Sequence, residues 1–333
     1  MKALTFKRYG KSPDIGFTEV AKPSIKSDEL LIEVYAVGLN PIDNMMPTGI
    51  FKEVLKFEVP ATLGSDVAGV VVSVGSAVTK FKVGDEVFAS VFDLGAGTLA
   101  DFAAVPEFAA AHKLERLSFV QAASVPMVGL TSWQALRERA NLVAGQKIFI
   151  PAGSGGIGTF AIQLAKYVGA WVATTTSAVN AGLVRSLGAD EVIDDRSQKF
   201  ENVLTSYDLV LGTVRGDELD RSIGIISAGG KIVSLVGPLD SAFAEKRGMS
   251  FIFNIIFSLM GWKTKRPARK RGVSYSFLFV RPDGVRLKEI ATIIRAGSIK
   301  PVIDQVFAFE DVKEALTYLA QGRAKGKVVV QMK

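Results

Sequence analysis

The sequence lacks cysteine altogether and has a single histidine, His112, among its 333 residues. These absences exclude disulfides, thiolate nucleophiles and the Cys/His ligand sets of protein zinc sites. With 12 prolines and 48% hydrophobic residues, the composition also leaves no room for long disordered tracts. The most apolar stretch, 249–262, contains Asn254 and two serines and is too short to span a bilayer. A chain of this length predicts two globular domains.

Positive charge is in excess, because 40 Lys and Arg stand against 33 Asp and Glu and give a net charge of +7. Such an excess suits an anionic cofactor, nucleic acid or an anionic membrane surface, and charge alone does not choose among them. The first seven residues alternate like a strand and contain no apolar signal region, which predicts a cytoplasmic protein.

The pattern of the sequence changes near residue 125. Residues 1–124 have short apolar segments at 30–37, 69–74 and 86–92 between Gly and Pro turns, which is typical of a small β barrel or sandwich. The following region alternates strands with helical periodicity and so predicts an α/β, doubly wound parallel sheet. The strands expected in this sheet are 147–150, 171–175, 191–194, 209–211 and 231–236. Two helices and a last strand are expected at 287–294, 311–319 and 328–331.

One glycine motif indicates the chemistry. Residues 147–158 (KIFIPAGSGGIG) have the pattern of a strand, a G-x-G-x-x-G turn and the start of a helix. We expect Gly153 to make the tight turn, Gly155 to let the backbone approach a pyrophosphate, and Gly158 to let the helix pack on the strand. The free N–H groups of the helix N-terminus bind phosphate. The predicted phosphate-binding residues are therefore Gly153, Ser154, Gly155, Gly156, Ile157 and Gly158.

The position that usually identifies NAD has no acidic residue in this chain. An acidic residue about 20 positions after the motif, at the end of the second strand, commonly binds the adenine ribose 2′-OH. Here that place is 174–177 (TTTS), and the first acidic residue after the motif is Asp190. Without that carboxylate the 2′-phosphate of NADPH is not repelled, so NADPH is favoured and NADH is the alternative.

Several stretches together resemble one known family. They are the 153–158 motif, GLNPID at 38–43, LGSDVAG at 63–69, KVGDEV at 82–87, AASVPMVGLTSWQAL at 122–136, LGADEVI at 187–193 and GKVVV at 326–330. Across essentially the whole chain they resemble the zinc-free quinone oxidoreductase and enone reductase branch of the medium-chain dehydrogenase/reductases. The resemblance implies a GroES-like, β-rich catalytic domain formed by residues 1–124 and 266–333. It also implies a Rossmann domain at 125–265 that is inserted into the catalytic domain, with the cofactor bound between the two.

The resemblance also indicates whether the protein binds zinc and which reaction it catalyses. In zinc-dependent relatives the segment aligned with 38–43 carries a Cys ligand and the one aligned with 64–66 a His ligand. This chain has Asn40-Pro41 and Ser65-Asp66 there, so we expect no zinc and no oxidation of a zinc alkoxide. The expected reaction is hydride transfer from NADPH to a quinone or to the β-carbon of an α,β-unsaturated carbonyl, acceptors that need little activation.

The resemblance places Asn40 and Thr131 beside the nicotinamide, as hydrogen-bonding groups for the ribose, the carboxamide or a substrate carbonyl. The alternative for Asn40 is a turn residue before proline, and Asp43 is equally well explained as a partner of backbone N–H groups. Relatives often have a Tyr near 48–51, where this chain has Phe51, so Tyr275 and solvent are left as candidate proton donors. His112 is more simply explained as a structural residue.

Two departures concern the 2′-phosphate. Where NADPH-specific relatives carry a Lys and a Tyr, this chain has the neighbourhood of Asn180 and Asp195, and a carboxylate at 195 repels phosphate. Arg196 and Lys327 either compensate or are plain surface charges. We therefore expect a weak preference for NADPH. The remaining predicted cofactor contacts are Thr176, Ser177, Val236 and Gly237.

The segment 251–271 is anomalous, because it is apolar first and then strongly basic. Such a segment suits docking on anionic lipid, and the alternative is a helix that covers the substrate cleft or the surface of an expected homodimer. A rival from another class is a cofactor-binding protein without turnover, such as a redox sensor or a binder of nucleic acid or a membrane surface. No RNA-binding motif accompanies the charge, so no nucleic-acid partner is expected.

Overall fold

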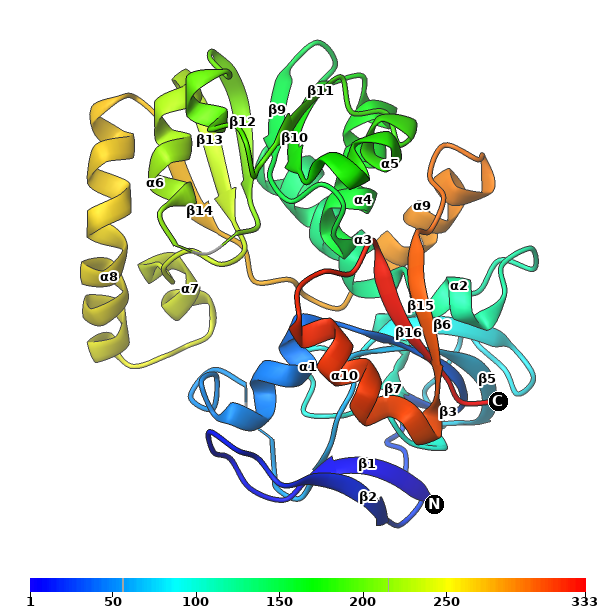
Figure 1. Ribbon diagram of the computed structural model, residues 1–333. Helices are drawn as coiled ribbons and strands as arrows, with labels where there is room; N and C mark the ends of the chain where they lie inside the picture. Colours follow the sequence, from blue (N-terminus) through cyan, green and yellow to red (C-terminus); the bar gives the residue numbers. More distant parts are fainter. Residues whose placement is uncertain (56, 215) are drawn as a thin grey trace. The chain divides into compact units, whose positions relative to one another are not determined.

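The computed structural model describes residues 1–55, 57–214 and 216–333, which form two compact units (Figure 1). The first unit comprises Met1–Leu130 and Val280–Lys333, and the second Thr131–Phe279. The chain therefore leaves the first unit, builds the second and returns. The boundaries lie at Leu130 and Phe279 rather than near 124 and 265. The second is later because strand β14 (Ser274–Phe277) pairs with β13 (Ile226–Ser234) in the sheet of the second unit.

The first unit is rich in antiparallel strands. One sheet has the order β15-β16-β3-β5-β6-β8, with β7 also paired to β3, and a smaller sheet has the order β2-β1-β4. The strands are β1 (Lys2–Phe6), β2 (Ile15–Glu19), β3 (Glu29–Leu39), β4 (Ala61–Thr62), β5 (Asp66–Val74), β6 (Glu86–Ser90), β7 (Phe102–Pro106), β8 (Ala110–His112), β15 (Ile303–Ala308) and β16 (Lys327–Gln331). The helices are α1 (Pro41–Met45), α2 (Phe119–Ala123), α9 (Gly284–Arg295) and α10 (Val312–Ala320).

Strand β3 organises this unit, because its nearly continuous apolar sequence is buried along most of its length. It pairs with β5 and β7 from the N-terminal segment and with β16 from the C-terminal segment. In the β16 pairing Val328 lies opposite Leu39, so the register brings Lys327 next to Asn40 although the two are far apart in the sequence.

The second unit has a six-stranded parallel sheet of order β11-β10-β9-β12-β13-β14. Its remaining strands are β9 (Lys147–Ile150), β10 (Trp171–Thr176), β11 (Glu191–Asp194) and β12 (Tyr207–Gly212). The order reverses between β9 and β12, which is the arrangement of a Rossmann fold. This confirms the predicted α/β fold with a doubly wound sheet and a separate β-rich part.

The helices of this unit are α3 (Pro126–Trp133), which crosses the boundary, α4 (Gly156–Val168), α5 (Ala181–Ser186), α6 (Glu218–Ser222), α7 (Ser241–Lys246) and α8 (Phe251–Lys270). Helix α4 buries Ala161, Leu164 and Ala165 on the face that the 3.6-residue periodicity predicts, and it ends at Gly169 in the left-handed region. Figure 1 shows α8 beside the β14 edge of the sheet. Among the described residues, no helix combines the length and the apolar character needed to cross a membrane.

Candidate functional site

The glycine turn after β9 lies at the carboxyl edge of the sheet, at the point where the strand order reverses. Open α/β sheets bind their ligands at this point. The turn itself differs from expectation in one detail. The left-handed residue is Ala152, with φ 53°, and not Gly153. Gly153 is required for another reason, since a Cβ there would lie 2.0 Å from Thr174 Oγ1.

The other two glycines have different surroundings. A Cβ on Gly158 would lie 2.5 Å from the Ala152 carbonyl oxygen and 2.6 Å from Gly153 Cα, so helix α4 can approach the turn only with glycine there. This agrees with the packing role expected from the sequence. Gly155 is the N-cap of α4, and the nearest atom to a Cβ there, Ala152 O, would be 3.4 Å away. Packing within the protein would therefore allow a side chain at residue 155. The absence of a side chain there suits a ligand that approaches the backbone.

Hydroxyl groups from neighbouring strands hold this turn in place. Thr174 Oγ1 donates to the Ile150 carbonyl at 2.6 Å, and Thr175 Oγ1 accepts from the Ala152 N–H at 3.1 Å. Thr213 Oγ1, just after β12, donates to the Pro151 carbonyl at 2.8 Å. The sequence analysis assigned no role to these threonines. The pattern that could have indicated one is the presence of hydroxyl residues at the ends of β10 and β12.

A cluster of neutral polar groups lies beside the turn. Thr176 Oγ1 donates to Ser154 Oγ at 2.9 Å. Asn180 Nδ2 lies 3.3 Å from both Ser154 Oγ and Ser177 Oγ. The Asp195 N–H donates to the Thr176 carbonyl at 3.2 Å, which ties the residue after β11 to the end of β10. The structure thus brings Ser154 of the glycine turn together with four residues predicted for the adenine end of the cofactor, Thr176, Ser177, Asn180 and Asp195, of which Asp195 is exposed at the margin.

Val236 and Gly237 follow β13 at the same carboxyl edge of the sheet. The Gly237 N–H donates to Ser234 Oγ at 2.7 Å, and a Cβ on Gly237 would lie 2.5 Å from Tyr275 Oη. Tyr275 Oη donates to the Pro238 carbonyl at 2.9 Å, and burial raises the pKa of this phenol. This geometry gives Tyr275 a structural role in holding the segment after β13, and its role as a proton donor stays a prediction.

In the first unit, Asn40 is the centre of a buried polar cluster. Lys327 Nζ donates to Asn40 Oδ1 at 2.6 Å and to the Leu39 carbonyl at 2.7 Å, and it lies 3.4 Å from Asp66 Oδ2. Asn40 Nδ2 donates to Asp66 Oδ2 at 2.9 Å and to Ser65 Oγ at 3.0 Å. The Asn40 amide is therefore hydrogen-bonded through both its oxygen and its nitrogen, which holds its orientation. A residue that only forms a turn before proline would not need these hydrogen bonds from its side chain.

The carboxylates of this cluster have shifted pKa values. Asp43 Oδ2 accepts from the Asn40 N–H at 2.7 Å, as the structural alternative for Asp43 predicted, while Asp43 Oδ1 is buried without a hydrogen-bond partner. Burial raises the pKa of Asp43 to about 7, although the hydrogen bond from Asn40 lowers it. Burial also raises the pKa of Asp66 and lowers that of Lys327, and the attraction between these two charges opposes both shifts.

Lys327 is not the plain surface charge that was the alternative to a 2′-phosphate ligand. Its ammonium group is buried, and its three N–H groups face three acceptors of the first unit. The other candidate cation, Arg196, is exposed next to Asp195. Thr131 is buried on α3, and its meeting with Asn40 at a nicotinamide stays a prediction. His112 is exposed, with Nδ1 3.9 Å from Asp85 Oδ2, in keeping with a structural role.

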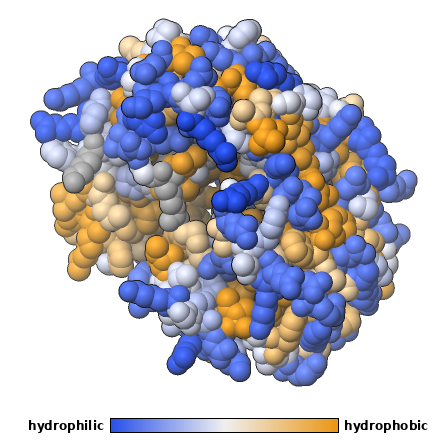
Figure 2. All heavy atoms as spheres, viewed as in Figure 1, coloured by the Kyte–Doolittle hydropathy of each residue, from blue (hydrophilic) through white to orange (hydrophobic). Residues whose placement is uncertain are grey.

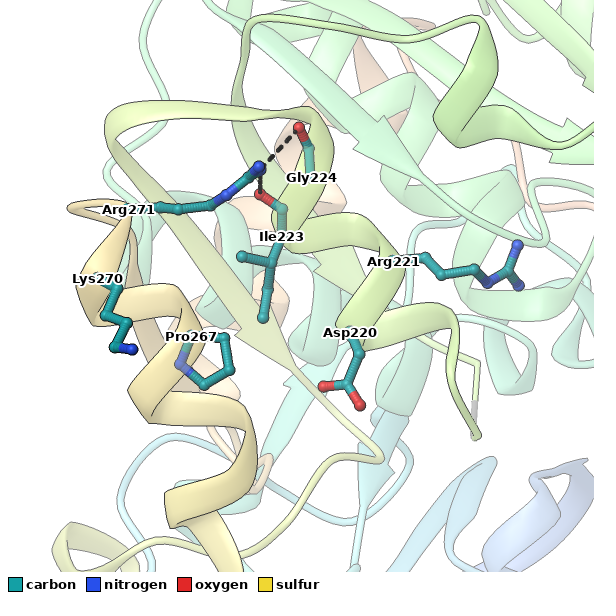
Figure 3. Close-up of a pocket in the computed structure, with 7 residues that line it drawn as sticks. All are labelled: Asp220, Arg221, Ile223, Gly224, Pro267, Lys270 and Arg271. Carbon is teal, nitrogen blue, oxygen red and sulfur yellow. Dashed lines mark hydrogen bonds between the residues drawn. The ribbon is translucent and has the colours of Figure 1, made fainter.

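At the two positions where the resemblance implies zinc ligands, this chain has the Asn40 amide and the Ser65 hydroxyl. Within 1–55, 57–214 and 216–333, no group of three or more His, Asp or Glu side chains is placed to hold a metal ion. A hollow of about 640 Å3 lies elsewhere, between the end of α6 and the end of α8 (Figure 3). Because the residues that precede β13 and β14 line it, this hollow is at the amino edge of the sheet, opposite the glycine turn.

Comparison with known proteins gives matches along the whole chain. Residues 26–116 match the family described as alcohol dehydrogenase GroES-like domain, and residues 187–330 match the one described as zinc-binding dehydrogenase. Human mitochondrial NAD(P)H oxidoreductase RTN4IP1 is 35% identical, over 100% of this chain and 89% of that protein. The chloroplastic NADPH-dependent alkenal/one oxidoreductase of Arabidopsis thaliana is 35% identical, over 99% of this chain and 79% of that protein. The solved quinone oxidoreductase from Coxiella burnetii superposes with a TM-score of 0.86 at 29% identity, over 100% of this chain and 99% of that one.

The sequence comparisons and the fold thus indicate the same family. The GroES-like match falls on the β-rich first unit, the Rossmann sheet has the expected strand order, and the relatives cover nearly the entire chain. One of the two family descriptions names zinc, and this chain has no cysteine. The chain belongs to the medium-chain dehydrogenase/reductase superfamily, in the branch of the quinone oxidoreductases and enone reductases.

Proposed function

We propose that this protein transfers a hydride from NADPH to a quinone or to the β-carbon of an α,β-unsaturated carbonyl, without zinc. The observation that carries the cofactor part is Gly155, which is bare at the N-terminus of α4 although the fold would accommodate a side chain there. A pyrophosphate bound at this end would accept hydrogen bonds from free N–H groups and benefit from the helix dipole. The reduced nicotinamide supplies the hydride.

The preference for NADPH rests on the polar cluster at the end of β10. Ser154, Thr176, Ser177 and Asn180 are neutral and can donate hydrogen bonds to a 2′-phosphate, and no carboxylate occupies the end of this strand. Asp195 lies beside them and is exposed, so its charge opposes the phosphate and keeps the preference small.

The acceptor class is supported by relatives and by the ligand chemistry of the first unit. The relatives are named for NAD(P)H, quinone and alkenal/one oxidoreduction. At the positions where the resemblance implies zinc ligands, this chain has the Ser65 hydroxyl and the Asn40 amide, which is bonded to Asp66 and Lys327, and neither residue binds zinc well. We assign Asn40 and Thr131 to the nicotinamide end, where they orient the cofactor and the acceptor. A homodimer and a cytoplasmic location stay predictions.

The test is a screen of NADPH and NADH oxidation against quinones, 2-alkenals and 2-enones, using protein treated with a chelator and checked by elemental analysis. We expect turnover with at least one of these acceptors and a higher kcat/KM with NADPH. Tight NADPH binding with no turnover of any acceptor would favour the rival interpretation, a cofactor-binding sensor.

A further inference from the structure

Helix α8 exposes an apolar surface along its first three turns. Within the described chain, seven of the nineteen exposed large apolar side chains fall between residues 251 and 262. They are Phe251, Ile252, Ile255, Ile256, Leu259, Met260 and Trp262. In Figure 2 hydrophobic atoms gather at the left, where Figure 1 places the N-terminal half of α8. Soluble monomers rarely gather so many on one surface unless it binds something.

These side chains are not a loosened part of the core, because α8 has a separate inner face. Phe257, Gly261, Thr264 and Ala268 are buried and recur every three or four residues, which defines one stripe of the helix. Ala268 packs within the core of the second unit. The exposed apolar residues are therefore additional to those that hold the helix on the protein.

The C-terminal end of α8 is fixed and basic. The Arg271 guanidinium donates through Nη1 to the carbonyls of Ile223 and Gly224, both at 3.2 Å, as the dashed lines in Figure 3 show. The neighbouring Arg269 and Lys270 are exposed. Helix α8 thus presents an apolar half followed by a basic half, and the end of the basic half is hydrogen-bonded to the segment before β13.

The positive charge of the chain is concentrated in this region. Residues 246–282 contain nine of the 40 Lys and Arg and none of the 33 Asp and Glu, so the rest of the chain has a net charge of −2. The overall charge of +7 therefore arises from one segment and not from a generally basic surface. An anionic surface is its electrostatic complement.

We propose that α8 docks this protein on an anionic lipid bilayer. The apolar half, from Phe251 to Trp262, inserts at the boundary between headgroups and acyl chains, and the cations that follow pair with lipid phosphates. Trp262 lies at the junction with the Arg266 guanidinium 4.8 Å from its ring centre, and an amphipathic ring is suited to this depth. The inference does not depend on the substrate of the enzyme.

Flotation of the full-length protein with vesicles tests the proposal. Vesicles of phosphatidylcholine alone are compared with vesicles in which roughly one third of the lipid is phosphatidylglycerol, at low and high salt. We expect binding to the anionic vesicles only, with at least a tenfold loss of the partition coefficient for Ile255→Ser with Leu259→Ser. The matched control is Val83→Ser with Val285→Ser, which changes two exposed apolar residues of the first unit.

The same flotation assay tests the contribution of the basic residues of α8. Arg269→Glu with Lys270→Glu should lower partitioning at least tenfold. The same charge reversal at exposed Lys288 and Arg295 on α9 should change it less than twofold. The proposal is overturned if the wild type floats with neither vesicle, or if the α8 variants float like the wild type. It is equally overturned if the apolar variant only dissociates an oligomer in sedimentation and keeps its affinity for vesicles, since α8 would then be an interface between copies.

Discussion

Replacement of Gly155 by Asp separates cofactor binding from folding. The position is the N-cap of α4 with extended backbone angles, φ −75° and ψ 173°, and an added Cβ meets nothing closer than 3.4 Å. Asp is a better N-cap than Gly by a few tenths of a kcal/mol, and its charge at the helix N-terminus contributes about 0.3–1 kcal/mol. The free energy of unfolding of Gly155→Asp should therefore equal or exceed that of the wild type by up to about 1 kcal/mol.

The affinity for the cofactor, in contrast, should fall in Gly155→Asp. The carboxylate would occupy the place of the pyrophosphate and repel it, and each lost hydrogen bond to a charged group costs about 1.5–3 kcal/mol. A loss of roughly 3 kcal/mol or more raises Kd for NADPH at least about a hundredfold.

Nicotinamide fluorescence titration measures the affinity, and thermal unfolding measures the stability. Gly10→Asp is the matched control, because Gly10 also has open space for a side chain but lies in the first unit. An unchanged Kd for Gly155→Asp would show that NADPH does not bind at the glycine turn. A large fall in Tm would show that the space around Gly155 is not open.

Three further predictions concern buried and exposed charges. Lys327→Met leaves the buried Asp66 carboxylate without its cation and should lower the free energy of unfolding by about 3–5 kcal/mol in urea titration, with partial recovery when Asp66→Asn is added. Burial raises the pKa of Asp43 to about 7, so the folded state holds this proton more tightly than the unfolded state. Stability should then fall as pH rises from about 4 to 7, by up to about 1.4 kcal/mol per pH unit, and Asp43→Asn should flatten that slope; equal slopes would contradict the assignment. The wild type should prefer NADPH over NADH by about tenfold in kcat/KM, and Asp195→Tyr should increase that ratio, whereas an unchanged ratio would show that residue 195 lies away from the adenine ribose.

Much of the fold follows from local sequence patterns. The strands at 147–150 and 191–194 have the predicted bounds, because short apolar runs between turns and helices leave few alternatives. The glycine motif also predicts its own site, since the spacing of three glycines depends on contacts within a few residues. The end of the second unit is harder to predict, because strand β14 is short and follows a long helix.

The features that the sequence does not reveal are long-range or conformational. Lys327 joins Asn40 and Asp66 only through the register of β16 on β3, and no local pattern marks a partner 287 residues away. The role of Tyr275 likewise depends on a backbone carbonyl of another segment. The left-handed turn at Ala152 is hidden because the adjacent glycine is the residue that such a turn ordinarily favours.

Steady-state NADPH oxidation decides whether this chain is the zinc-independent quinone or enone reductase that we propose. The wild type and Gly155→Asp are assayed in parallel with each acceptor class, on protein whose zinc content has been measured. We expect turnover by wild-type protein that contains far less than one zinc per chain, and no turnover by the variant under the same conditions. Activity that requires stoichiometric zinc, or that persists undiminished in Gly155→Asp, would contradict the proposal.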